Sequence, residues 1–272
     1  MKQLFFSSVL AILVNFSGIS QTKNNNEINE ITKTVMLYID GTENGNPEKV
    51  RTAFEPNFSL FLTRKDTLAK IEGKGYIDRI QKGKKYNRIG KIIAIDYEND
   101  AASVKVDVYF PDRNRVATDY LLLLKINDTW KILHKIINLK TLDKADHKKI
   151  SNKNEIHLIN RTLLDYIEGT ANGKPNRIKE AFHKDFNLYY IKSQALSIID
   201  GQKYISNFKQ GKKNNRIGKV LSVDYEGNAA LAKIEVLMPN RNRIAIDYLL
   251  LLKIKGKWKI IHKSFTSKKH DN

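Results

Sequence analysis

An internal duplication constrains the fold of this chain more than any other sequence feature. Shifting the 272-residue sequence along itself by 128 positions (156 minus 28) aligns residues 28–137 with 156–265 without a gap. YIDGTENGNP at 38–47 matches YIEGTANGKP at 166–175, and DYLLLLKINDTWKILHK at 119–135 matches DYLLLLKIKGKWKIIHK at 247–263. The period far exceeds that of a solenoid repeat, so each copy is a whole domain. The sequence predicts domains at 26–138 and 155–267, joined by a polar linker at 139–154.

The first twenty residues have the pattern of a signal peptide. Lys2 is followed by an apolar stretch from Leu4 to Phe16, and Gly18-Ile19-Ser20 offers a cleavage site before Gln21. The apolar stretch is short and interrupted, so we expect no membrane span. The expected mature protein is exported, periplasmic or extracellular, and soluble.

Composition narrows the possible chemistry. The chain has 0 cysteines, which excludes disulfides, thiolate metal sites, a cysteine nucleophile and a lipid-anchored cysteine. Lysine and arginine number 48 against 29 acidic residues, for a formal charge of +19. This balance favours anionic partners, although a lysine-rich composition produces the same excess without any site.

Each copy predicts helices first and strands afterwards. Ile28, Ile31, Val35 and Tyr38 form the stripe of an amphipathic helix. A second helix has Asn46 as its N-cap and Pro47 at its first position and ends near Phe54. A strand covers 58–63, and a third helix around 76–80 ends at Gly83. Period-two alternation then predicts four strands, at 89–97, 101–110, 115–126 and 130–137. The expected fold class is α+β, with a mostly antiparallel sheet in each domain.

The opening helix ending in YIDGTENG, the strand pair GKIIAIDYENDAA at 90–102 and the hairpin DYLLLLKINDTWKILHK carry a family resemblance. They are similar to the nuclear-transport-factor-2-like superfamily, and more narrowly to its lumazine-binding branch, close to polyketide-cyclase-like proteins. The resemblance implies three helices packed on the concave face of a curved sheet, with a pocket at the wide end. The superfamily includes both enzymes and binding modules, so the resemblance does not fix an activity.

The last hairpin supplies the candidate catalytic residues. A turn at Asn127-Asp128 places Leu121 opposite His134 and puts Asp119 and His134 on one face, the same face as Trp130. We therefore expect Asp119 and His134 to be diagonal neighbours on an apolar wall, where they could act as an acid–base pair or simply satisfy one another. Asp247 and His262 repeat the arrangement.

Aromatic residues supply the candidate ligand-binding set. They could line a cone that holds a small hydrophobic or aromatic ligand, or they could be ordinary core. The set comprises Tyr38, Tyr76 and Trp130 in the first copy and Tyr166, Tyr204 and Trp258 in the second, with Phe54 and Phe182 beside them.

Basic loops form a third candidate site. Their duplicated side chains could bind a polyanion bivalently or could be solvated surface charge. They are Lys84, Lys85, Arg88, Lys91, Arg113 and Arg115, repeated as Lys212, Lys213, Arg216, Lys219, Arg241 and Arg243. No metal-ligand spacing, phosphate-binding glycine loop or nucleophile elbow is present. We expect no metal, no cofactor and no specific nucleic-acid partner.

The sequence therefore predicts an exported tandem small-molecule-binding module, without a convergent catalytic set. One alternative is a polyketide-cyclase-like or isomerase-type enzyme that uses an Asp/His pair in each pocket. Another is a protein that binds an anionic polysaccharide. The leucine runs at 121–124 and 249–252 are apolar on both faces, so we expect the two domains to pack together as an intrachain pseudo-dimer.

Overall fold

The computed structural model describes residues 16–142 and 153–270. The predicted signal peptide lies outside these residues up to position 15, and the predicted linker lies outside them from 143 to 152. Among the described helices, none is long and apolar enough to cross a membrane.

Each copy folds into three helices, six strands and one short 3-10 turn, in the same order. The first copy contains α1 (Phe16–Glu43), α2 (Pro47–Ala53), β1 (Phe54–Arg64), β2 (Thr67–Glu72), α3 (Gly73–Ile77), β3 (Ile89–Glu98), β4 (Ala101–Phe110), η1 (Pro111–Arg113), β5 (Arg115–Ile126) and β6 (Thr129–Thr141). The second contains α4 (Lys153–Ala171), α5 (Pro175–Ala181), β7 (Phe182–Lys192), β8 (Ala195–Asp200), α6 (Gly201–Ser206), β9 (Ile217–Glu226), β10 (Ala229–Met238), η2 (Pro239–Arg241), β11 (Arg243–Ile254) and β12 (Lys257–Lys269).

The six strands of each copy form one sheet. The strand orders are β2-β1-β6-β5-β4-β3 and β8-β7-β12-β11-β10-β9. Only the β1–β6 and β7–β12 pairs are parallel among the described strands, because the chain crosses the sheet once in each copy. The α+β fold class is confirmed.

Several elements differ from the sequence prediction, among them β1, which begins at Phe54 and not at 58. Strand β2 was not expected, because Lys65 and Asp66 make its hairpin turn with positive φ values of 47° and 58° and without a glycine. Helix α3 ends at Ile77, well before Gly83. Strand β6 continues to Thr141, where it still pairs with Arg115.

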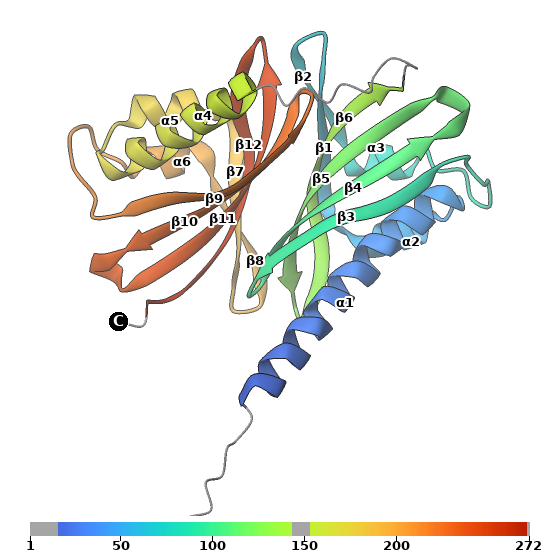
Figure 1. Ribbon diagram of the computed structural model, residues 1–272, viewed down its shortest axis with the longest axis horizontal. Coiled ribbons are helices and arrows are strands. Elements are labelled where there is room, and N and C mark those ends of the chain that lie inside the picture. The colour runs from blue at the N-terminus through green and yellow to red at the C-terminus, as the bar shows by residue number, and fades with distance from the viewer. Residues whose placement is uncertain (1–15, 143–152, 271–272) are drawn as a thin grey trace, which may run out of the picture.

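One face of each sheet packs against the helices of its own copy. In the first copy, Leu121, Leu123 and Ile132 share a core with Ile31 and Val35 of α1, and all five are fully buried. Helix α2 begins as expected, with the Asn46 side chain accepting from the Lys49 backbone N–H at 3.1 Å. Figure 1 shows the helices on the outer sides of the molecule and the two sheets turned toward each other in the middle.

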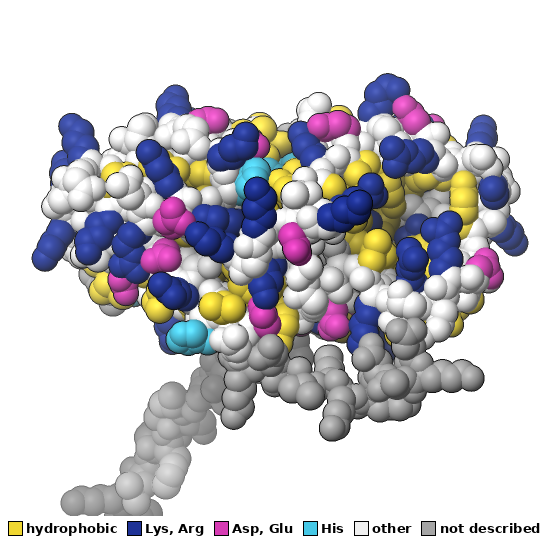
Figure 2. All heavy atoms as spheres, turned by 90° about the horizontal axis from the view of Figure 1, so that it is seen from above, with side chains coloured by type: hydrophobic (Ala, Val, Ile, Leu, Met, Phe, Trp, Pro, Cys, Tyr) yellow, Lys and Arg dark blue, Asp and Glu magenta, His cyan; other side chains and the backbone are white. Residues whose placement is uncertain are grey.

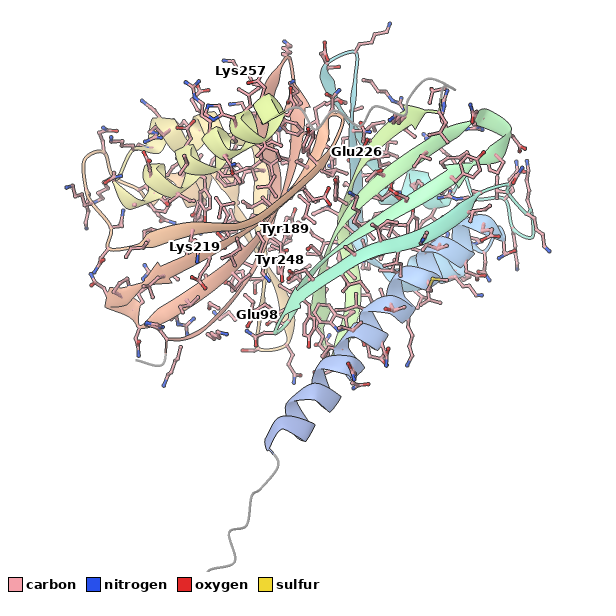
Figure 3. All side chains as sticks on the ribbon, viewed as in Figure 1. Glu98, Tyr189, Lys219, Glu226, Tyr248 and Lys257 are labelled. Atoms are coloured by element: carbon pink, nitrogen blue, oxygen red, sulfur yellow. The ribbon has the colours of Figure 1, made fainter. Side chains whose placement is uncertain are left out.

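The other faces of the two sheets form a shared apolar core. Leu122 and Leu124 of β5 lie in one cluster with Leu250 and Leu252 of β11, and none of the four has any exposed surface. This is the packing expected from the leucine runs. In Figure 3, the labelled Tyr248 and Tyr189 lie between the two sheets.

Reciprocal polar contacts surround that core. Lys105 contacts Asp224 at 2.8 Å, and its counterpart Lys233 contacts Asp96 at 2.6 Å. The Tyr248 hydroxyl also donates to Asp96, at 2.5 Å. Because each contact is repeated with the domains exchanged, the two copies are related by an approximate twofold axis.

Candidate functional site

A β-bulge in β6 determines which side chains enter the cone. The pairing of β5 with β6 begins in the expected register, with Leu123 opposite Ile132, but shifts at the next step so that Leu122 pairs with His134. The extra residue, Leu133, leaves Leu133 and His134 both facing the other domain. Lys135 takes the inward position.

The expected pairing of Asp119 with His134 is therefore wrong, and so is that of Asp247 with His262. The same shift occurs in β12, where Leu250 pairs with His262. Both carboxylates face the interior of their own domain, and both imidazoles face the domain boundary. The catalytic role suggested for these four residues stays an untested prediction, but it cannot involve a direct pair within one cone.

Asp119 instead belongs to a buried cluster with Tyr38 and Lys135. The Tyr38 hydroxyl donates to Asp119 Oδ2 at 2.6 Å, and Lys135 Nζ donates to the Tyr38 hydroxyl at 2.8 Å and to Asp119 Oδ2 at 3.1 Å. The exposed fraction is 0% for Tyr38, 1% for Asp119 and 3% for Lys135. A buried charge requires such partners.

Aromatic rings and an arginine side chain cover this cluster. Lys135 Nζ lies 4.6 Å from the centroid of the Tyr38 ring and 5.3 Å from that of Tyr76. Arg88 Nη2 lies 3.5 Å from the Tyr38 hydroxyl, and the guanidinium lies 5.1 Å from the Phe110 ring centroid. Arg88 and Tyr76 are half-buried, so they separate the cluster from solvent.

The protonation states follow from burial and charge. Burial raises the pKa of the Tyr38 phenol well above its ordinary value, and the nearby Asp119 carboxylate raises it further. Burial lowers the pKa of Arg88, but its interactions with the neighbouring Tyr38, Tyr76 and Asp119 outweigh that effect and raise it overall. Tyr38 is thus a protonated donor, and Arg88 a permanent cation.

The second domain repeats the cluster. The Tyr166 hydroxyl donates to Asp247 Oδ2 at 2.6 Å, and Lys263 Nζ lies 3.0 Å from both the Tyr166 hydroxyl and Asp247 Oδ2. Lys263 Nζ also lies 5.5 Å from the centroid of the Tyr204 ring. Burial lowers the pKa of Arg216, but its interactions with the neighbouring Tyr204, Tyr166 and Asp247 together raise it well above its ordinary value.

One oxygen of the first cluster has no partner. Asp119 Oδ1 is buried and accepts no hydrogen bond from any described residue. Buried polar atoms in proteins nearly always have a partner. This oxygen is therefore available to a donor that the chain itself does not provide.

The expected aromatic set is divided between two places. Tyr38 and Tyr76 lie together around Lys135, as Tyr166 and Tyr204 lie around Lys263. Trp130 donates its indole N–H to Glu27 at 2.9 Å. Glu27 precedes Tyr38 by eleven residues on α1, or about 16 Å along the helix axis. Trp130 therefore belongs to another part of the core, and Trp258, bonded to Glu155 at 2.9 Å, does likewise.

Cavities among the described residues lie outside the clusters. One of about 310 Å³ is lined by Phe54, Phe58 and Ile77 on the helix side of the first domain. A second, of about 320 Å³, lies beside Trp258 in the second domain. The third, of about 510 Å³, lies between the domains and includes His134 and His262. Among the described residues, no cluster of three or more histidine and acidic side chains is placed to hold a metal ion.

The basic loops are not one surface. Lys84, Lys85, Lys212 and Lys213 are exposed, but Arg88 and Arg216 turn inward toward the clusters. Figure 1 places the loop before β3 and the loop before β9 at opposite ends of the molecule. Figure 2 shows lysine and arginine spread over the face seen from above, with acidic side chains between them.

Comparison with known proteins identifies the family. The family model described as "Putative lumazine-binding" matches residues 26–137 and again 154–266. "Aldolase FrzH" from Cladobotryum sp is 30% identical over 109 residues, which cover 39% of this chain and 86% of that protein.

Solved structures of similar proteins include two nuclear-transport-factor-2-like proteins of unknown function. One, from Shewanella baltica OS155, is 22% identical, and the match covers 44% of this chain and 98% of the other with a TM-score of 0.39. The other, from Methylobacillus flagellatus KT, is 25% identical, and the match covers 44% of this chain and 96% of that protein, also with a TM-score of 0.39. Because the family model matches twice and over more than half of the chain, this protein belongs to the family described as "Putative lumazine-binding", as two tandem copies.

Proposed function

We propose that each domain binds one small planar ligand that carries both carbonyl oxygens and a ring N–H. The observation that carries this proposal is the buried Tyr–Asp–Lys cluster beneath a half-buried arginine, present in both copies. With Arg88 included, the first cluster has two cations and one carboxylate. That excess of positive charge favours electron-rich oxygens, because charges interact strongly where water is excluded.

The groups in the first domain complement such a ligand. Arg88 is a donor for a carbonyl oxygen, and Asp119 Oδ1 is an acceptor for a ring N–H. The face of Tyr76 offers a stacking surface. Lumazine, the compound in the family description, is a flat heterocycle that presents carbonyl oxygens beside ring N–H groups.

In this proposal, a ligand reaches the cluster when the half-buried side chains above it move. We expect Arg88 and Tyr76 to rotate away from Tyr38, which uncovers Asp119. The 310 Å³ cavity beside Phe54 gives the neighbouring aromatic side chains room to adjust, since the Phe54 ring centroid lies 5.5 Å from that of Tyr38. Ligand pockets are typically apolar with a few placed polar groups, which this region matches.

Lumazine fluorescence provides the test. In the native chain we expect saturable binding, and in the double variant Arg88→Met with Arg216→Met a loss of affinity of at least about ten-fold. The matched control is Arg115→Met with Arg243→Met, which removes two exposed arginines and the same charge. Equal weakening in both double variants, or no saturable binding to the native chain, would contradict the proposal.

Aldol chemistry is a second candidate, favoured by the likeness to Aldolase FrzH. A Schiff-base route would require Lys135 or Lys263 to attack a carbonyl as a neutral amine. Lys135 Nζ is already bonded to Asp119 Oδ2 and lies over the faces of the Tyr38 and Tyr76 rings, and a substrate carbonyl would have to replace these contacts. We therefore expect borohydride reduction in the presence of pyruvate to add no mass at either lysine, and covalent addition there would establish the enzymatic alternative.

Polyanion binding ranks behind ligand binding. The two basic loops lie at opposite ends of the molecule, so a bivalent contact would have to span its whole length. If the loops act as a site, replacing Lys84, Lys85, Lys212 and Lys213 by Ser should weaken heparin binding more than four lysine changes elsewhere. We expect equal weakening, which reflects net charge alone.

Export and the division into domains are part of the proposal. We propose that cleavage before Gln21 releases a mature chain whose domains span 26–138 and 155–267. N-terminal sequencing of the protein recovered from the periplasm or medium of the producing cells tests this. A first residue of Met1 in that material would exclude cleavage.

A further inference from the structure

The cavity between the two domains has the features of a separate binding site. It has a volume of about 510 Å³, within the range of small-molecule pockets. Phe61, Leu68, Tyr189 and Ile261 supply apolar walls from both copies. Tyr189 is labelled in Figure 3, between the two sheets.

Two buried histidines occupy this boundary because of the bulges in β6 and β12. His134 and His262 are 6% and 4% exposed, and their rings stack with centroids 4.2 Å apart and an angle of 18°. Tyr189 lies edge-on to His134 at 4.7 Å, and Phe61 lies edge-on to His262 at 4.8 Å. The aromatic neighbours fix both rings in place.

The hydrogen bonds of His134 define its tautomer. Burial lowers the pKa of His134 to about 3, so the ring is neutral at physiological pH. The Ser59 backbone N–H donates to His134 Nδ1 at 3.3 Å, which leaves the ring proton on Nε2. That Nε2–H donor is buried and has no acceptor among the described residues.

The His262 ring is also buried, neutral and left with an unpaired nitrogen. Burial, the adjacent His134 and the Lys70 ammonium lower its pKa well below the ordinary value, so this ring is neutral as well. The Asn187 backbone N–H contributes a hydrogen bond to this ring that partly offsets the lowering, and His262 Nε2 has no hydrogen-bond partner among the described residues. A neutral imidazole carries one N–H, so the cavity is bounded by two unpaired donors.

Two lysines at the rim add further N–H donors, each beside a carboxylate. Lys70 and Lys184 line the cavity, against the single carboxylate of Asp185 among the lining residues. Lys70 is paired with Glu72 at 2.8 Å, and Lys184 approaches Asp185 at 3.8 Å. The deep donors and the rim lysines together suit an anionic group, while the apolar walls suit a hydrocarbon body.

We propose that the cavity between the domains binds a small organic acid, whose carboxylate accepts from His134 Nε2–H beside Lys70 and whose apolar body contacts Leu68 and Tyr189. This site is distinct from the cone interiors, because His134 and Lys135 face opposite sides of β6. It exists only where both domains meet, so neither copy alone can form it.

The test uses benzoate as the probe and neutral benzamide as its isostere. Calorimetric titration of the full chain should give benzoate an affinity at least about ten-fold higher than that of benzamide. His134→Phe, which keeps a ring in the stack but removes the N–H, should weaken benzoate binding by at least about ten-fold. His157→Phe on α4 is the matched control, since His157 is exposed and outside the cavity, and it should leave the affinity unchanged.

Equal affinities for benzoate and benzamide, no saturable benzoate binding, or full affinity in His134→Phe would each overturn the proposal. If His134→Phe fails to fold, histidine ¹⁵N spectra of the native chain decide the matter. Saturating benzoate should then shift the Nε2–H resonances of His134 or His262, and unchanged resonances at both rings would overturn it.

Discussion

The substitution Asp119→Asn removes the negative charge of the first buried cluster and leaves the charge of Lys135. Lys135 is 3% exposed and would keep only the Tyr38 hydroxyl as a strong acceptor, at 2.8 Å. Removing one partner of a buried ion pair typically costs about 3–5 kcal/mol, because the remaining charge is desolvated without compensation. We expect a loss of that size in the first domain's free energy of unfolding.

The double substitution Asp119→Asn with Lys135→Met separates this cause from simple loss of packing. It removes both charges, and replacing a buried pair by apolar groups is often neutral or stabilising. We therefore expect it to recover at least about 2 kcal/mol of the loss.

Urea unfolding followed by tryptophan fluorescence measures both variants. The chain has two tryptophans, and Trp130 is buried in the first domain, so a Trp258→Phe background makes the signal report the domain that carries the mutation. A double variant less stable than Asp119→Asn, or a single-variant loss below about 1 kcal/mol, would refute the reasoning.

Three further predictions follow from the same contacts. Tyr38→Phe removes a hydroxyl bonded at 2.6 and 2.8 Å, so it should cost about 1–3 kcal/mol in urea unfolding, whereas an exposed Tyr→Phe change should cost almost nothing. The pKa of His134 is lowered to about 3 from an unfolded value near 6.5, so its stabilising contribution is present above about pH 6.5 and is lost as the pH falls toward 3. The Tm of His134→Phe should therefore depend less on pH across that window than the Tm of the native chain. An unchanged pH profile of the Tm would contradict this. Gly73→Ala would place a Cβ 2.4 Å from the Phe58 ring, so calorimetry should show a lower Tm, while Gly75→Ala, with open space around it, serves as the control.

The overall fold was predictable because its signals are long and repeated. The duplication, the helix stripe ending at Tyr38 and the period-two segments identify the two α+β domains, and the leucine runs on both faces of β5 and β11 indicate that the sheets pack together. Strand β2 was not predictable in the same way, because its turn at Lys65-Asp66 lacks the glycine or asparagine that usually marks a tight hairpin.

The candidate site was predicted only in part. Asp119 and Tyr38 were named, but Lys135 was not, because strict alternation continued through the bulge places Lys135 on the face opposite Asp119. The sequence contained a sign of the bulge. Ile132-Leu133 and Ile136-Ile137 are each two consecutive apolar residues, and such pairs break the alternation of a regular strand. A one-residue slip exchanges the two faces, and in this chain it exchanged an imidazole for an ammonium in the interior.

A crystal structure of the chain soaked with lumazine is the most direct test of the proposed ligand site. We expect density for the heterocycle against Tyr76, with a ring N–H within hydrogen-bond distance of Asp119 Oδ1 and a carbonyl oxygen within reach of Arg88. Density in the cavity between the domains alone, or an undisplaced Arg88 over the Tyr38 hydroxyl at saturating lumazine, would contradict the proposal that the cone interiors bind the ligand.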